Sequence, residues 1–181
     1  MPRIKDIYLD CAIYLYPNKQ CALNGERAGG SGFLVSIPSK IYTDISHRYA
    51  VTNSHVIREG QSPVIRMNTE HGAMDVLEYE IDDWTHHPDG DDIAVCPLQI
   101  DRKHFIYRTV DEEIFLSEED IKEEDLGIGD EVFMIGRFVD HEGKQNNTPS
   151  IRFGNISMMP IANYPNGTFV SARVFQPDLQ S

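Results

Sequence analysis

Short apolar runs separated by turn residues recur along the chain and predict β-strands. The first run, Ile7–Tyr16 (IYLDCAIYLY), is rich in β-branched and aromatic residues and ends before the turn signal Pro17-Asn18. Further strands are expected at Phe33–Ile37, Arg48–Thr52, Ser62–Met67, Met74–Ile81 and Asp91–Leu98. Helical patterns are scarce, and no repeat with a period of roughly 20–50 residues is visible. The pattern predicts an all-β fold.

A second, shorter set of strands is expected after an acidic stretch. Eleven acidic residues and one basic residue lie between Asp111 and Glu131, which is typical of a solvated connector; a docking face for a basic partner is the alternative. Ser117 stands three residues before Asp120, a capping-box pattern that predicts a short helix. The later strands are expected at Asp130–Gly136, Ser150–Met158 and Thr168–Phe175.

Composition and charge exclude several classes of protein. The formal net charge of −13 over 181 residues disfavours general nucleic-acid binding. No apolar run approaches the ~18–20 residues that a membrane span needs, and the first residues make a poor signal peptide. Three cysteines (Cys11, Cys21 and Cys96) without a C-x-x-C pair indicate reduced thiols. We therefore expect a cytoplasmic protein that binds neither nucleic acid nor membrane.

Three phrases, in this order, resemble the trypsin-like (chymotrypsin-fold) serine peptidase family. They are GGSGFLVSIP (Gly29–Pro38), YAVTNSHVI (Tyr49–Ile57) and HPDGDDIAVCPL (His87–Leu98). Val132–Gly136 and Gly154–Ser157 more weakly resemble opening strands of the family's second barrel. The resemblance covers roughly residues 29–158 and is closest to bacterial members that lack disulfides.

The resemblance implies a chymotrypsin-like double β-barrel whose C-terminal barrel is incomplete. The expected division is an N-terminal barrel at 1–110, an acidic connector at 111–129 and a partial C-terminal barrel at 130–181. An unpaired edge of that barrel would need a second copy of the chain or another protein to complete it. The implied substrate is a protein or peptide, with no cofactor and no metal.

His55 and Asp92 are the catalytic residues that the resemblance implies. His55 would act as general base and acid, and Asp92 would fix its tautomer and orientation. Asp92 is chosen over Asp91 because it directly precedes Ile93-Ala94, as the family's aspartate does. The two residues are 37 positions apart, against roughly 45 in the chymotrypsin template.

A nucleophilic serine in the family's Gly-x-Ser-Gly setting does not follow Asp92. The template places it roughly 90 residues after the aspartate, near position ~185 and just past Ser181. Ser31 in Gly29–Gly32 fits the phrase but precedes His55 and leads into a strand, so its glycines are interpreted as structural. The chain is then either a fragment of an active peptidase, which the presence of both His55 and Asp92 favours, or a degenerate fold that ends at Ser181.

Three other functions are weighed against the peptidase. A structural metal could bind the titratable residues His86, His87, Asp89, Asp91 and Asp92, but these share one short segment without zinc-ligand spacing. Cys96 could be a thiol nucleophile, but its apolar strand predicts a buried thiol. The third is a non-catalytic pseudo-peptidase that acts as a protein-binding module through the acidic stretch or an open edge.

Overall fold

The computed structural model describes residues 4–42, 44–137, 145–159 and 174–175. The chain forms two compact units. The first contains residues Met1–Glu113 and Gly136–Ser150, and the second contains Ile114–Ile135 and Ile151–Ser181. These units differ from the expected division, because residues 114–129 of the expected connector cluster with later strands and residues 136–150 cluster with the first unit.

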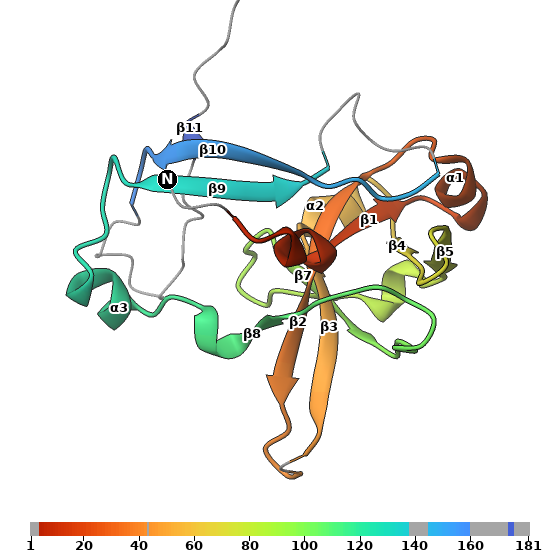
Figure 1. The fold of residues 1–181 in the computed structure, drawn as a ribbon, viewed down its shortest axis with the longest axis horizontal. Coiled ribbons are helices and arrows are strands. Elements are labelled where there is room, and N and C mark those ends of the chain that lie inside the picture. Colours follow the sequence, from red (N-terminus) through yellow and green to blue (C-terminus); the bar gives the residue numbers. More distant parts are fainter. Residues whose placement is uncertain (1–3, 43, 138–144, 160–173, 176–181) are drawn as a thin grey trace, which may run out of the picture. The chain divides into compact units, whose positions relative to one another are not determined.

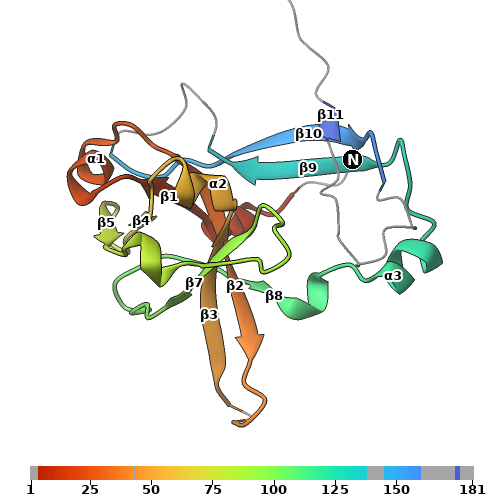
Figure 2. The same ribbon diagram turned by 180° about the vertical axis from the view of Figure 1, so that it is seen from behind.

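The first unit is built on one eight-stranded sheet (Figures 1 and 2). Its strands are β1 (Ala12–Tyr16), β2 (Gly30–Pro38), β3 (Ser46–Thr52), β4 (Val64–Asn68), β5 (Met74–Leu77), β6 (Thr85–His86), β7 (Ala94–Leu98) and β8 (Val110–Asp111). The described pairings run in the order β5-β4-β1-β2-β3-β7-β6, all antiparallel, and β8 pairs in parallel with β2. The expected all-β class is confirmed, and the pairings of the described residues form an open path.

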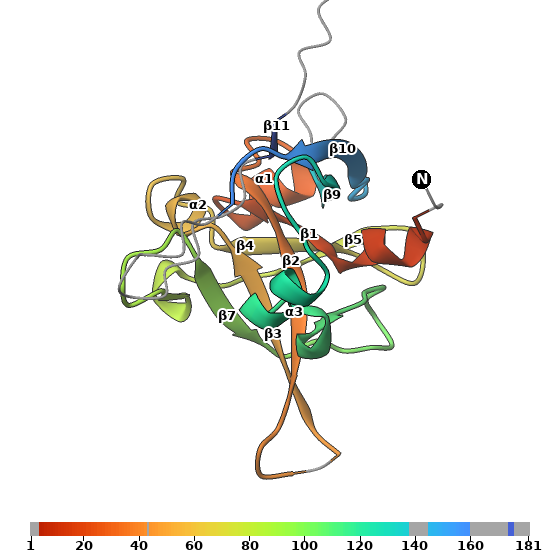
Figure 3. The same ribbon diagram turned by 90° about the vertical axis from the view of Figure 1, so that its left-hand side faces the viewer.

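Helices are few and short in the first unit. They are α1 (Lys19–Asn24), α2 (Ser54–Arg58), and 3-10 turns at Asp6–Cys11 and Ile81–Asp83. None of the helices in the described residues has the length and apolar character needed to cross a membrane. The β2–β3 hairpin projects beyond the other strands of this unit, as the side view in Figure 3 shows.

One local prediction for the first 25 residues was wrong, and one helix was not predicted. Only Ala12–Tyr16 of the expected strand Ile7–Tyr16 is extended, and Asp6–Cys11 is a 3-10 helix. Within this helix the carbonyl oxygen of Asp10 accepts a hydrogen bond from the Arg108 amide, which is not a partner in the β1 ladder. The chain bends at Pro17-Asn18 as expected, but the unpredicted helix α1 follows. The Asn18 side chain caps this helix by accepting the Cys21 amide at 2.9 Å, and Gly25 ends it at φ 67°.

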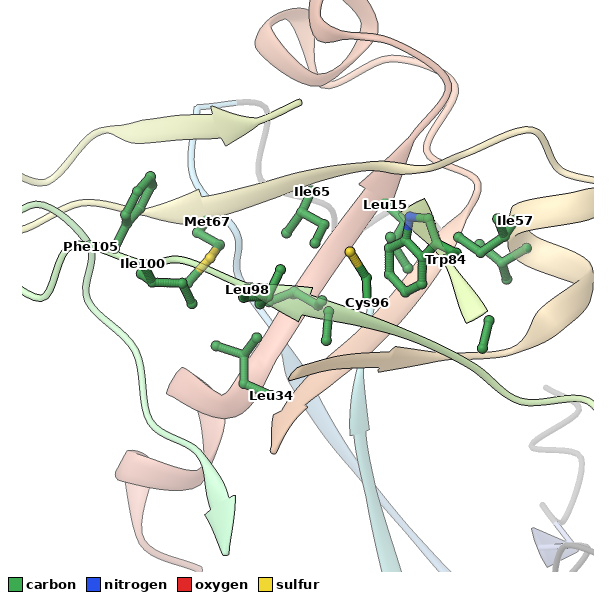
Figure 4. Close-up of a cluster of buried hydrophobic side chains, with 14 residues drawn as sticks. Leu15, Leu34, Ile57, Ile65, Met67, Trp84, Cys96, Leu98, Ile100 and Phe105 are labelled. Atoms are coloured by element: carbon green, nitrogen blue, oxygen red, sulfur yellow. The ribbon is translucent and has the colours of Figure 1, made fainter. Parts of the chain in front are cut away.

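The core of this unit is a cluster of buried apolar side chains between the strands. Figure 4 shows Cys96 inside it, between Ile65 and Trp84. The Trp84 ring is buried, and its Nε1 donates to the carbonyl oxygen of Pro63 at 3.2 Å, which satisfies the one polar atom of that side chain. Burial of this cluster supplies the main force that holds the sheet together.

A buried arginine ties the segment around Asn147 to the sheet. The Arg66 side chain is fully buried, its Nε donates to Asn147 Oδ1 at 2.8 Å, and its Nη1 donates to the Ala22 carbonyl at 3.0 Å. The guanidinium also lies over the rings of Tyr14 and Tyr16, at 5.7 and 4.8 Å from their centroids. A buried charge is tolerated only with such partners, so Arg66 fixes where this segment packs.

The glycines of the Gly-rich phrase are required by close packing, as expected from the sequence. A Cβ at Gly32 would overlap the carbonyl oxygen of Val51 on the paired strand β3. A Cβ at Gly30 would come within 2.8 Å of Val56 Cγ2 on α2. These residues therefore let β2 approach β3 and α2 more closely than any other residue type allows.

The second unit contains a three-stranded sheet in the order β11-β10-β9. Its elements are α3 (Glu118–Glu123), β9 (Glu131–Gly136), β10 (Ser150–Ile156) and β11 (Val174–Phe175). The capping box predicted at Ser117 is confirmed, since Ser117 Oγ accepts the Asp120 amide at 3.1 Å and the Asp120 carboxylate accepts the Ser117 amide at 2.7 Å. Most of the strand expected at Thr168–Phe175 lies outside the described residues.

Replacing Gly32 by alanine tests the close approach of β2 to β3. We expect Gly32→Ala to lower the free energy of unfolding by ~1–3 kcal/mol, because the new Cβ must push the Val51 carbonyl aside. Urea unfolding followed by circular dichroism measures this difference. Gly127→Ala is the control, since a Cβ at Gly127 meets no atom within 4 Å, and an equal loss in both variants would contradict the packing argument.

Candidate functional site

The register of two neighbouring strands brings the two predicted catalytic residues together. Strand β3 pairs antiparallel with β7, and Thr52 lies opposite Ala94. The chain leaves β3 at Thr52 and enters α2, on which His55 lies, while Asp92 stands two residues before β7. Both residues therefore lie at the same end of the β3–β7 ladder, although 37 residues separate them in sequence.

The Asp92 carboxylate holds His55 at two points. Oδ2 of Asp92 is 2.6 Å from Nδ1 of the His55 ring, and Oδ1 accepts the backbone N–H of the same histidine at 2.9 Å. The side chains of His55 and Asp92 are 55% and 52% exposed. The imidazole nitrogen is thus within the hydrogen-bonding distance that a base and its orienting carboxylate require.

The electrostatics of the pair favour an ionised carboxylate beside the ring. Desolvation acts to raise the pKa of Asp92, but hydrogen bonds from the His55 amide, the His55 ring and the Asn53 side chain outweigh it and leave the pKa below the usual aspartate value. An ionised carboxylate only accepts hydrogen bonds, so Nδ1 carries the proton in this contact. The lone pair of a neutral His55 ring then lies on Nε2, which can accept a proton.

Two neighbouring residues contribute contacts that the sequence interpretation did not assign. The Asn53 amide nitrogen donates to the Asp92 carbonyl oxygen at 3.1 Å and to its Oδ2 at 3.2 Å. Ser54 Oγ lies 2.7 Å from Nδ1 of His86 on β6. The sequence gives no signal for either contact, because Asn53 and Asp92 are 39 residues apart and Ser54 and His86 are 32 residues apart.

The residues considered for a metal take part in separate contacts. His86 contacts Ser54, Nδ1 of His87 lies 3.5 Å from Oδ2 of Asp91, and Asp92 contacts His55. Within the ranges that the structure describes, no group of three or more histidine, cysteine or acidic side chains is arranged to hold a metal ion.

Ser31 lies within β2 rather than at an exposed turn. It is paired with Tyr14 of β1, and its carbonyl oxygen accepts the Thr52 hydroxyl at 3.0 Å. The glycines beside it are explained by the packing described above. The serines at positions 171 and 181 lie outside the described residues.

Cys96 lacks the environment of a nucleophilic thiol. Its side chain is fully buried in the apolar cluster, and burial raises the pKa of the Cys96 thiol to about 12. At neutral pH almost none of it is thiolate, the reactive form. Cys11, Cys21 and Cys96 are all free cysteines in the structure, and Cys21 is the most accessible of the three.

Comparisons with known proteins add no further support for or against the resemblance. No protein-family model, curated protein or solved structure matches this chain. The functional interpretation therefore rests on the three sequence phrases and on the geometry of His55 and Asp92.

The lowered pKa of Asp92 predicts a pH-dependent effect of Asp92→Asn on stability. The ionised carboxylate stabilises the folded chain above the ordinary aspartate pKa, and this contribution disappears as the pH falls through the lowered value. We expect the variant to be less stable at neutral pH, by at most ~1 kcal/mol because the pair is half exposed. The difference should begin to shrink below about pH 4 and disappear only once the pH has fallen through the lowered pKa of the wild-type carboxyl.

Urea unfolding at several pH values between about 7 and about 3 measures this difference. Asp89→Asn is the matched control, because Asp89 belongs to the same loop and has no hydrogen bond or ion pair with the described residues. A difference between Asp92→Asn and wild type that stays constant over this pH range would show that the carboxylate charge does not stabilise the site.

Thiol labelling tests the assignment of Cys96 as a buried structural residue. Under native conditions we expect Ellman's reagent to react first with Cys21, which is partly exposed, while Cys96 reacts only after unfolding. Cys21→Ser should abolish the fast phase. Rapid modification of Cys96 in the folded chain, located by mass spectrometry, would contradict the assignment.

Proposed function

We propose that this chain carries the general base and the orienting carboxylate of a trypsin-like serine endopeptidase. The observation that supports this most directly is the two-point contact between Asp92 and His55, at 2.6 Å to the ring and 2.9 Å to the amide. One contact fixes the protonated ring nitrogen and the other fixes the main chain of the same residue. Together they hold the second ring nitrogen in a defined direction, as a base requires.

The proposed reaction is acyl transfer to a serine hydroxyl. Nε2 of His55 takes the hydroxyl proton as the serine oxygen attacks the peptide carbonyl carbon. The imidazolium, stabilised by ionised Asp92, then gives that proton to the leaving amine as the peptide C–N bond breaks. In the second half, water replaces the amine: Nε2 takes a proton from water and returns it to the serine oxygen, which releases the acid product.

The nucleophilic serine is proposed to lie outside these 181 residues. Ser31 is placed inside a strand, and no serine after Asp92 stands in a Gly-x-Ser-Gly phrase. The oxyanion-hole glycine and the pocket that selects the substrate side chain would accompany that serine. The substrate class is therefore proposed only as protein or peptide.

The proposed architecture is the chymotrypsin-like double barrel. The antiparallel sheet of the first unit would form the first barrel, and β9, β10 and β11 would belong to the second. This proposal draws on the order and position of the three family-like phrases, which fall on β2, on β3 with α2, and on β7. The cytoplasmic location expected from the composition is retained as part of the proposal.

Fluorophosphonate labelling and peptide hydrolysis test the function. In a form of the protein that includes a Gly-x-Ser-Gly serine after Asp92, we expect labelling at that serine and peptidase activity. Asp92→Asn should lower kcat by about 10⁴-fold, because the ring then presents the wrong tautomer. His55→Ala should lose at least as much, since no base remains.

Two controls and two contradicting outcomes complete this test. The 181-residue chain alone should show no labelling above background, and Ser31→Ala should behave as wild type in the longer form. Hydrolysis undiminished in His55→Ala would overturn the mechanism. A longer form that keeps both His55 and Asp92 but shows neither labelling nor hydrolysis would favour the pseudo-peptidase function.

A further inference from the structure

We propose that Asn53 is a positioning residue, which locks the Asp92 carboxylate in the orientation that His55 needs. The inference rests on the proposed function, since it assigns a role within the same base. Among the residues that the structure describes, three donors surround the Asp92 carboxylate, namely the His55 amide, the His55 ring and the Asn53 side chain. Only the last of these comes from a residue other than the base itself.

The contacts of Asn53 restrict rotation of the Asp92 side chain. One nitrogen, Nδ2, donates to both the main-chain carbonyl oxygen and the carboxylate Oδ2 of Asp92, at 3.1 and 3.2 Å. An amide nitrogen carries two hydrogens, so it can satisfy both acceptors at once. Both partners are acceptors only, which identifies the nitrogen of the Asn53 amide as the atom that faces them. The bridge thereby fixes the carboxylate relative to its own backbone.

Asn53 makes this bridge in place of its usual local contact. It is the N-cap residue of α2, with φ −73° and ψ 140°, and an asparagine there commonly accepts an amide from the first turn of the helix. Its side chain makes no such contact. The Asp92 carboxylate accepts the His55 amide instead, and Asn53 donates to Asp92. Asp92 therefore accepts the helix amide that an N-cap side chain usually accepts, and Asn53 donates a hydrogen bond to Asp92.

The chain offers a matched control for a merely structural role. Ser54 is the next residue of the same helix turn, and its hydroxyl contacts His86 at 2.7 Å without touching Asp92. Removing that hydroxyl disturbs the same turn by one hydrogen bond but leaves all three donors of the carboxylate in place. A generic loosening of α2 would therefore appear in both Asn53→Ala and Ser54→Ala.

Nuclear magnetic resonance of the 181-residue chain measures the effect without requiring activity. In Asn53→Ala we expect the pKa of Asp92, followed by its carboxyl carbon, to rise toward the ordinary aspartate value, because a donor to the charged form is lost. We also expect the His55 Nδ1 proton resonance to broaden or disappear through faster exchange with water. Asn53→Asp keeps the shape but brings a negative charge, so it should raise the Asp92 pKa further. Ser54→Ala should leave both signals as in wild type.

Wild-type protein provides a second measurement that needs no variant. If Asn53 binds the carboxylate, its side-chain amide protons should shift with the same midpoint as the Asp92 carboxyl, whereas those of Asn24, which contacts Gln20 and Glu26, should not follow that midpoint. Unchanged Asp92 and His55 signals in Asn53→Ala, or Asn53 protons that do not follow Asp92, would overturn the proposal.

Asp92→Asn separates this proposal from the proposed function. One result is that Asp92→Asn abolishes the His55 Nδ1 proton signal while Asn53→Ala changes nothing. That result would overturn the positioning role of Asn53 but leave the proposed pair of His55 and Asp92 intact. If Asp92→Asn leaves the His55 signal unchanged, the pair itself does not exist and both proposals fail.

Discussion

The alignment of β3 with β7 is the constraint on which the candidate site depends. Thr52 lies opposite Ala94, so the residues that follow β3 and those that precede β7 meet at one end of the ladder. Side chains alternate between the two faces of a strand, and a slip of one residue would move the chain on to the other face and carry Asp92 away from His55. The close approach of β2 at Gly32 helps to hold β3 in this register. The contact between His55 and Asp92 therefore depends on backbone pairing before any side chain contributes.

The sequence predicted the strands well where short apolar runs are bounded by strong turn residues. β2, β3, β7 and the capped helix α3 lie where they were expected, because glycine, proline and the Ser117 capping box act locally. Prediction failed at Asp6–Cys11 and α1, where the outcome depends on which distant group accepts or donates. The Arg108 amide donates to the Asp10 carbonyl oxygen, and the Asn18 side chain caps α1. A pattern of apolar runs gives no signal for either contact.

For the site, the family-like phrases located both His55 and Asp92, and the structure places their side chains within hydrogen-bonding distance. The supporting contacts could not be read in the same way. The contact of Ser54 with His86 spans 32 residues and that of Asn53 with Asp92 spans 39, so each exists only once β3, β6 and β7 are paired. The sequence also did not predict how exposed the side chains of His55 and Asp92 are. The aspartate of a working triad is buried, whereas Asp92 is half exposed, so water competes with its hydrogen bonds.

The buried Arg66 has a consequence for how the protein is made on the ribosome. Its partner Asn147 lies 81 residues further along the chain. The guanidinium therefore lacks that acceptor until the segment around Asn147 has left the ribosome. His55, Asp92 and Asn53 are all translated well before then. The contact between His55 and Asp92 can therefore form before Arg66 gains this acceptor and the first unit completes its packing.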